Sequence, residues 1–171
     1  MRKRDEAQFI EFAAGAARGL RRTAYLMCGD WQRAEDAVQD ALIRVYVAWP
    51  RLRQRQSLRA YATKTVVSVV MDQAKRPWRR EHASADPLDA VDERRDHPCA
   101  VGDRLFVVQA LSALPPRQRA CVVLRYLEDM SVEETAEAMG TSSGTVKSQT
   151  ARGLESMRAA LGGIGSTLDL G

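Results

Sequence analysis

The stretch SVEETAEAMGTSSGTVKS, residues 131–148, has the spacing of two helices joined by a tight turn. Ser131 and Glu134 fit a capping box, in which each side chain accepts a hydrogen bond from the backbone N–H of the other residue. Gly140 suits the left-handed conformation that ends many helices. Thr141 and Ser142 then supply a turn and a second N-cap. The pattern predicts a helix-turn-helix whose second helix is the longer one.

This second helix is predicted to have a buried stripe and an exposed face. Its inward positions recur at helical spacing from Val146 through Leu154 to Leu161. In a helix-turn-helix, the N-terminal part of the second helix contacts base edges in the major groove of DNA. The outward side chains are small hydrogen-bonding groups and two cations, which suit contacts with bases and phosphates. They are Ser143, Thr145, Lys147, Ser148 and Arg152.

Spacing alone leaves a second interpretation of this hairpin open. A solvent-exposed helical hairpin without DNA-binding function has the same pattern. Residues 104–171 carry seven basic and seven acidic side chains. Because phosphate contacts dominate affinity for DNA, a net charge of zero argues against tight DNA binding by this half alone.

Helical periodicity extends over most of the remaining chain. Gly29 is expected to close the first helix, and Pro50 is expected to end the second. No segment alternates between apolar and polar residues as a half-buried strand would. The sequence therefore predicts an all-α fold. The further expected helices lie within residues 9–27, 31–49, 57–77, 105–114 and 121–127.

Charge is distributed unevenly and suggests two small helical domains. Residues 1–80 carry 17 basic and 8 acidic side chains, so this domain is the stronger candidate for phosphate contact. Residues 81–103 carry 2 basic and 7 acidic side chains without periodicity, which predicts a flexible linker. The second domain is expected over residues 104–161. The glycine-rich residues 162–171 are expected to form a disordered tail.

Several functional classes lack support in the sequence. No stretch approaches the roughly 20 apolar residues that span a bilayer, so we expect a cytoplasmic protein without membrane insertion. Cys28, Cys99 and Cys121 lie far apart, and His82 and His97 are not at metal-ligand spacing from them, so no metal and no cofactor are expected. No clustered catalytic side chains occur, so no enzyme is expected. Cys28 and Cys121 fall in apolar patterns, which indicates buried thiols.

The second predicted helix carries an acidic cluster within the basic domain. The cluster consists of Glu35, Asp36, Gln39 and Asp40. Such a cluster is often only a solvated helix surface. Its functional interpretation is a docking face for a basic partner, because surface charges steer encounter and fix orientation.

The third predicted helix places Lys64, Ser68, Asp72 and Lys75 on one face and runs into a basic, tryptophan-containing segment. Cations beside an indole ring suit single-stranded nucleic acid, whose phosphates and unstacked bases they contact. The alternative is a basic helix end that complements the helix dipole, with Trp78 packed on the core. The loop at residues 50–57 is also basic and permits nucleic-acid contact.

One set of motifs consists of residues 20–26 (LRRTAYL), Gly29-Asp30 and residues 33–42 (RAEDAVQDAL), and a second set consists of residues 114–119 (LPPRQR), 123–126 (VLRY) and 144–148 (GTVKS). The first set resembles region 2, and the second set region 4, of the extracytoplasmic-function sigma factors of RNA polymerase, in the sigma-70 class and its SigE-like subfamily. The two sets occur in the family's order, are separated by the predicted linker, and cover most of the chain outside residues 77–103 and the last ten.

The resemblance implies an initiation subunit without catalytic activity, which binds core RNA polymerase and directs it to promoters. Region 2 would dock through the acidic cluster on the clamp helices of the largest subunit, and region 4 on the flap of the second subunit. Residues 143–152 would read the minus-35 element, and many relatives are held inactive by an anti-sigma factor. The minus-10 element would be contacted by Arg53, Arg55, Tyr61, Lys64, Ser68, Lys75, Arg76, Trp78, Arg79 and Arg80.

The main rival interpretation is a stand-alone helix-turn-helix regulator whose first domain senses a ligand. That protein would bind specific DNA tightly without polymerase, whereas two weak DNA contacts on a sigma factor become selective only when polymerase joins them. A gel-shift experiment separates the two.

Overall fold

A computed structural model of the chain describes residues 3–52, 58–75 and 101–168. Within these ranges it contains helices and no strand, which confirms the predicted all-α fold. The predicted nucleic-acid contacts Arg53, Arg55, Arg76, Trp78, Arg79 and Arg80, as well as Cys99, lie outside the described residues. The elements are α1 (Lys3–Cys28), α2 (Trp31–Leu52), α3 (Leu58–Ala74), α4 (Val101–Ser112), α5 (Pro116–Val122), the π-helix η3 (Val123–Leu127), α6 (Val132–Met139) and α7 (Ser143–Leu168).

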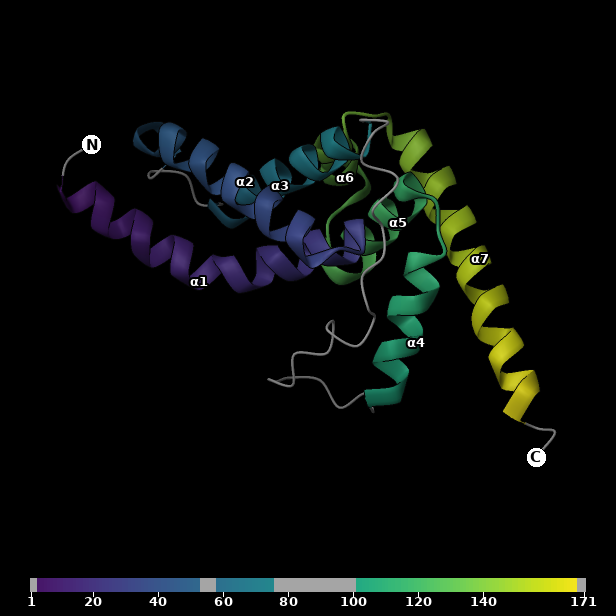
Figure 1. The fold of residues 1–171 in the computed structure, drawn as a ribbon. Helices are drawn as coiled ribbons and strands as arrows, with labels where there is room; N and C mark the ends of the chain where they lie inside the picture. Colours follow the sequence, from purple (N-terminus) through teal and green to yellow (C-terminus); the bar gives the residue numbers. More distant parts are fainter. Residues whose placement is uncertain (1–2, 53–57, 76–100, 169–171) are drawn as a thin grey trace.

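Helices α1, α2 and α3 pack on one another and form the first group in Figure 1. Their contact surfaces contain fully buried alanines such as Ala24, Ala34 and Ala62, which allow the helix backbones to approach closely. Where the start of α1 meets the end of α2, Trp49 is buried against Phe9 and Phe12. Its ring centroid lies 5.3 Å from that of Phe9 and 5.5 Å from that of Phe12. The apolar spacing seen in the sequence therefore faces a single core.

Helices α4 to α7 form the second group and contain the predicted helix-turn-helix, α6 and α7. The backbone N–H of Glu134 donates to Ser131 Oγ at 3.0 Å, and the N–H of Ser131 donates to Glu134 Oε2 at 2.7 Å. Gly140 ends α6 in the left-handed region with φ 61°. Ser142 caps α7 by accepting from the N–H of Thr145 at 3.2 Å. Each signal in the first stretch of sequence is thus confirmed.

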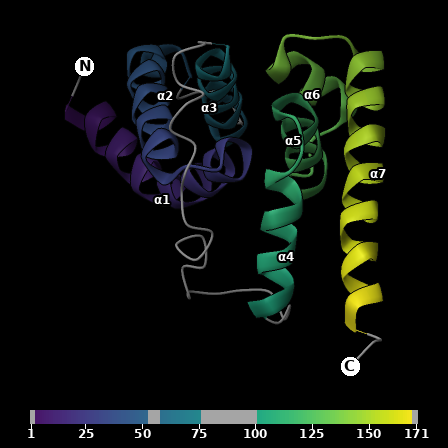
Figure 2. The same cartoon turned by 45° about the vertical axis from the view of Figure 1, so that its right-hand side comes forward.

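The two groups share one apolar core across their junction. Leu111, Leu114, Val123 and Leu124 belong to the same buried cluster as the core residues of α1 to α3. Helix α3 contacts α6, and α1 contacts α5. In Figure 2, α5 and α6 lie between the first group and α7. The outer helix α7 therefore lies on the side of the second group that is away from α1 to α3.

The structure corrects three expected boundaries. Helix α2 continues past Pro50 to Leu52, although Pro50 has no N–H for the helical ladder, and the burial of Leu52 stabilises this last turn. Helix α4 begins at Val101, within the segment expected to be linker. Helix α7 continues to Leu168 through part of the expected disordered tail. Extending an existing helix is easier than starting one, because each residue that is added also gains a hydrogen bond.

Candidate functional site

The acidic cluster lies on the outer surface of α2. Asp36, Gln39 and Asp40 are exposed, and Asp36 accepts a hydrogen bond from Gln32 Nε2 at 3.2 Å. Glu35 is half-buried and forms an ion pair with Arg21 on α1, with Nε and Oε2 3.4 Å apart. The structure thus brings the four predicted residues together on α2, and Glu35 is the one whose charge is paired with a neighbouring cation.

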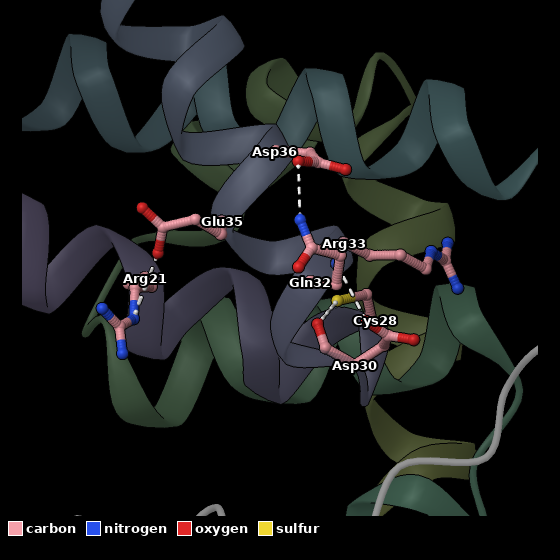
Figure 3. Close-up of polar contacts among 7 residues, drawn as sticks. All are labelled: Arg21, Cys28, Asp30, Gln32, Arg33, Glu35 and Asp36. Atoms are coloured by element: carbon pink, nitrogen blue, oxygen red, sulfur yellow. Dashed lines mark hydrogen bonds and ion pairs between the residues drawn. The ribbon is translucent and has the colours of Figure 1, made fainter.

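The start of α2 is fixed by the residues that precede it, as Figure 3 shows. Gly29 ends α1 with φ 71°, a conformation that favours glycine. Asp30 then caps α2, because its Oδ1 accepts from the N–H of Arg33 at 2.9 Å. Trp31 stacks on Tyr25 with ring centroids 4.0 Å apart. The turn at Gly29 and Asp30, together with the stacking of Trp31 on Tyr25, sets the direction of α2 relative to α1. It therefore also sets the direction in which the acidic side chains of α2 point.

The described part of the predicted minus-10 surface lies along α3. Tyr61, Lys64 and Ser68 are half-buried, whereas Lys75 is exposed and pairs with Asp72 at 3.2 Å. The Lys64 ammonium forms an ion pair with Glu137 of α6. This face of α3 is therefore partly covered by the helix-turn-helix.

The predicted reading face of α7 is open. Lys147, Ser148 and Arg152 are exposed, while Val146 and Thr150 on the opposite side are buried. Ser143 and Thr145 are half-buried, and the Thr145 hydroxyl lies 2.9 Å from that of Ser142. Of the five predicted residues, the two cations and Ser148 are thus the ones most available to a ligand.

Sequence reasoning missed the residues that join the two groups. Arg119 of α5 donates to the carbonyl oxygens of Met27 at 3.4 Å, Ser112 at 2.8 Å and Leu114 at 3.0 Å. Burial lowers the pKa of the Arg119 guanidinium from its ordinary value. In the sequence, the one indication that Arg119 could join the two groups is its position within the motif at residues 114–119. A guanidinium has the five donors that such carbonyl capture requires.

The two described cysteines are buried, as the apolar pattern predicted. Burial raises the pKa of both thiols, that of Cys121 to about 11, so the nucleophilic thiolate is disfavoured. Among residues 3–52, 58–75 and 101–168, no group of three or more metal-ligating side chains lies together. No helix in those ranges is both long enough and apolar enough to cross a bilayer.

Comparison with protein families matches both halves of the chain. Residues 15–80 match the model for sigma-70 region 2, and residues 107–157 match the model for sigma-70 region 4. The first match contains α2 and α3, and the second contains α6 and the part of α7 up to residue 157. Sigma factors are transcription initiation factors.

Curated relatives match nearly the whole chain. It is 33% identical over 156 residues to the RNA polymerase sigma-E factor of Streptomyces coelicolor, covering 90% of this chain and 86% of that protein. It is 30% identical over 153 residues to the ECF RNA polymerase sigma factor SigM of Mycobacterium tuberculosis, covering 90% of this chain and 76% of that one.

Solved structures share the fold. The sigma factor RpoE of Bartonella quintana, in complex with the anti-sigma factor NepR, matches with a TM-score of 0.68 at 22% identity, covering 90% of this chain and 96% of that one. CnrH in complex with the cytosolic domain of CnrY matches with a TM-score of 0.63 at 19% identity, covering 92% and 90%. Motifs, fold and relatives agree: the chain belongs to the extracytoplasmic-function group of RNA polymerase sigma factors, which direct the polymerase to promoters to initiate transcription.

Proposed function

We propose that the two halves of this sigma factor divide its contacts with polymerase and promoter. Residues 1–80 dock on core RNA polymerase and contact the minus-10 element, and residues 104–161 read the minus-35 element. The observation that carries the proposal is the position of the two exposed faces. The acids of α2 and the cations of α7 lie in different halves of the chain, so both are available to different partners at once.

The docking face is the exposed triad Asp36, Gln39 and Asp40. Its partner is a basic helical surface, which we identify with the clamp helices of the largest polymerase subunit. The ion pair between Arg21 and Glu35 neutralises one neighbouring charge, so Asp36 and Asp40 carry the electrostatic part of the contact. Rim charges of this kind mainly set association rate and orientation.

The reading face consists of Lys147, Ser148 and Arg152 on α7. Its support is the capped and rigid start of this helix, where Ser142 fixes the first turn. Long cationic side chains there reach phosphates or the acceptor edge of guanine, and a serine hydroxyl pairs with several bases. A second contact of this half, with the flap of the second polymerase subunit, is part of the proposal.

An anti-sigma factor is a further proposed partner. RpoE of Bartonella quintana was solved with the anti-sigma factor NepR, and it shares this fold over most of its length. The proposal places the protein in the cytoplasm, because that is where bacterial polymerase meets the chromosome.

The docking assignment is tested by pull-down of core RNA polymerase with the variant Asp36→Arg, Asp40→Arg. We expect a loss of affinity of about tenfold or more, since the reversed charges repel a basic partner. Circular dichroism should be unchanged because both side chains are exposed. The matched control is Glu6→Arg, Glu11→Arg, which makes the same charge change on exposed positions of α1. Equal affinity of both variants for the polymerase would refute the assignment.

A further inference from the structure

We propose that Asp72 and Lys75, an ion pair at the end of α3, together recognise one G·C base pair through the major groove of the minus-10 element. Lys75 belongs to the predicted minus-10 surface, whereas Asp72 is an acid on that surface to which no role has been assigned. The inference rests on the proposed function in one respect, which is the contact between α3 and the minus-10 element.

The two side chains project from a well-packed part of the backbone. Lys75 Nζ lies 3.2 Å from Asp72 Oδ1, and the two side chains are 66% and 57% exposed. The neighbouring residues of α3 are buried in the apolar core, and they are Val69, Val70, Met71 and Gln73. The backbone that carries the pair is therefore held by packing, while the carboxylate and the ammonium stay open to a ligand.

Asp72 lies on the same side of α3 as the other predicted contacts of this helix. Ser68 precedes it by four residues and Lys64 by eight, the spacing at which side chains follow one another along a helix face. Lys64 pairs with Glu137 of α6, so its ammonium is engaged by the second half. In the described part of the chain, the Asp72 and Lys75 side chains bond to each other and leave the end of this face uncovered.

Helix stability does not explain an acid at this position. Asp72 lies in the last turn of α3, where the partial negative charge of the helix end disfavours a carboxylate. Its ion pair with Lys75 is exposed, and such pairs contribute little to folding. A carboxylate also repels the phosphates that a DNA-contact face approaches. On such a face it becomes favourable where it meets a hydrogen-bond donor of the nucleic acid.

The donors that DNA offers to a carboxylate in the major groove are the amino groups of its bases. Cytosine presents its N4 amino group there, and the guanine paired with it presents O6 and N7 as acceptors. A carboxylate accepts from cytosine N4, and a lysine ammonium donates to guanine O6 and N7. Asp72 and Lys75 provide an acceptor beside a donor, which is what the edge of one G·C pair requires.

An A·T pair fits this ion pair less well. Adenine N6 and thymine O4 also form a donor and an acceptor, but thymine offers the ammonium one acceptor in place of two and adds a methyl group. That methyl group displaces water from the charges without replacing its hydrogen bonds. The ion pair therefore favours G·C, and because it is exposed, separating its charges to admit the base edges costs little. This edge exists in paired DNA, so the contact belongs to the double-stranded part of the element.

The test uses holoenzyme reconstituted from core RNA polymerase and the full chain, with a promoter library in which the minus-10 element is randomised. Sequencing of the bound templates gives the base preference at each position. We expect the wild type to favour G·C over A·T about tenfold at one position, which is the effect of one good base contact. Asp72→Ala with Lys75→Ala should abolish that preference and leave the other positions unchanged. The matched control is Lys3→Ala with Glu6→Ala, which removes an exposed lysine and an exposed acid at the same spacing on α1.

The exchange Asp72→Lys with Lys75→Asp separates base recognition from a structural role. It retains both opposite charges, so an ion pair that only stabilised α3 would keep the G·C preference, whereas we expect the exchange to remove it. Survival of the preference in either double variant would overturn the proposal. So would a change in binding that is equal for all templates, because it would show that the pair acts on phosphates alone.

The variant Lys64→Ala tests the proposed function separately. If it weakens binding to the library while the Asp72 variants keep the wild-type preference, the minus-10 contact of α3 stands and base recognition by the ion pair fails. If neither Lys64→Ala nor the Asp72 variants change the binding of any template, the minus-10 contact of α3 fails as well.

Discussion

A Cβ atom placed on Gly153 of α7 would lie 2.8 Å from Cγ2 of Val122 in α5, and 3.4 Å from the carbonyl oxygen of Gln118. Real Cβ atoms do not approach so closely, and the branched side chain of Val122 has few rotamers with which to withdraw. The absence of a side chain at Gly153 therefore sets the distance between α5 and α7.

This contact predicts that Gly153→Ala destabilises the protein. The better helix propensity of alanine contributes about 1 kcal/mol, but overpacking costs about 1–3 kcal/mol, so we expect a net loss of about 1 kcal/mol. Gly15→Ala is the matched control, because nothing lies within 4 Å of its new Cβ, and it should stabilise the chain by about 0.5–1 kcal/mol. Urea denaturation measures both free energies of unfolding. Stabilisation by both substitutions would contradict the tight packing.

The capping box predicts that Ser131→Ala lowers the free energy of unfolding by about 1 kcal/mol. The substitution removes the acceptor of the Glu134 N–H and leaves one end of α6 unsatisfied. Ser131→Asp retains an acceptor and should restore most of the loss. Thermal denaturation followed by circular dichroism checks this. An aspartate variant as unstable as the alanine variant would exclude the cap as the cause.

The reading face of α7 predicts a promoter-dependent effect of Lys147→Ala with Arg152→Ala. Both side chains are exposed, so the fold should be retained. Each lost base contact costs about 1–3 kcal/mol, and the loss should fall on promoters that depend on the minus-35 element. Transcription from templates with and without that element is the measurement. Equal losses on both templates would count against the role of α7 in recognition.

The buried Cys121 predicts pH-dependent stability. Burial raises its pKa to about 11, whereas an unfolded chain has a thiol pKa of about 8.5. The thiol therefore contributes stability that is fully present below about pH 8.5 and is lost as the pH rises towards 11. Cys121→Ser should show a smaller loss of stability over that interval in urea titrations at pH 8 and pH 10. An identical pH dependence in both proteins would remove the thiol from the explanation.

Local signals predicted the helix-turn-helix well. Ser131, Glu134 and Gly140 each interact with backbone atoms only a few residues away. Their spacing in the sequence is therefore enough to predict where α6 begins and ends. The buried stripe of α7 is likewise visible as periodicity, although Leu161 at its end is 37% exposed. Continuation of α2 past Pro50 depends on tertiary burial of Leu52, which local rules do not contain.

The junction between the halves was beyond sequence reasoning. Lys64 and Glu137 are 73 positions apart, and Thr23 and Glu128 are 105 positions apart. The sequence assigns Lys64 to a helix face, includes Thr23 only within the motif at residues 20–26, and assigns no role to Glu128 or Glu137. A single sequence shows charge and periodicity, but it does not show which distant surfaces pack together. The contact between α3 and α6 therefore emerged only from the fold.

The promoter selectivity that this chain gives to core RNA polymerase can be measured in a reconstituted system. Transcription by purified core polymerase, with and without the full chain, on a library of the host's upstream regions tests it most directly. We predict discrete start sites that appear only with the wild-type chain and disappear with Asp36→Arg, Asp40→Arg. Start sites that are the same with and without the protein would show that the chain does not confer promoter selectivity.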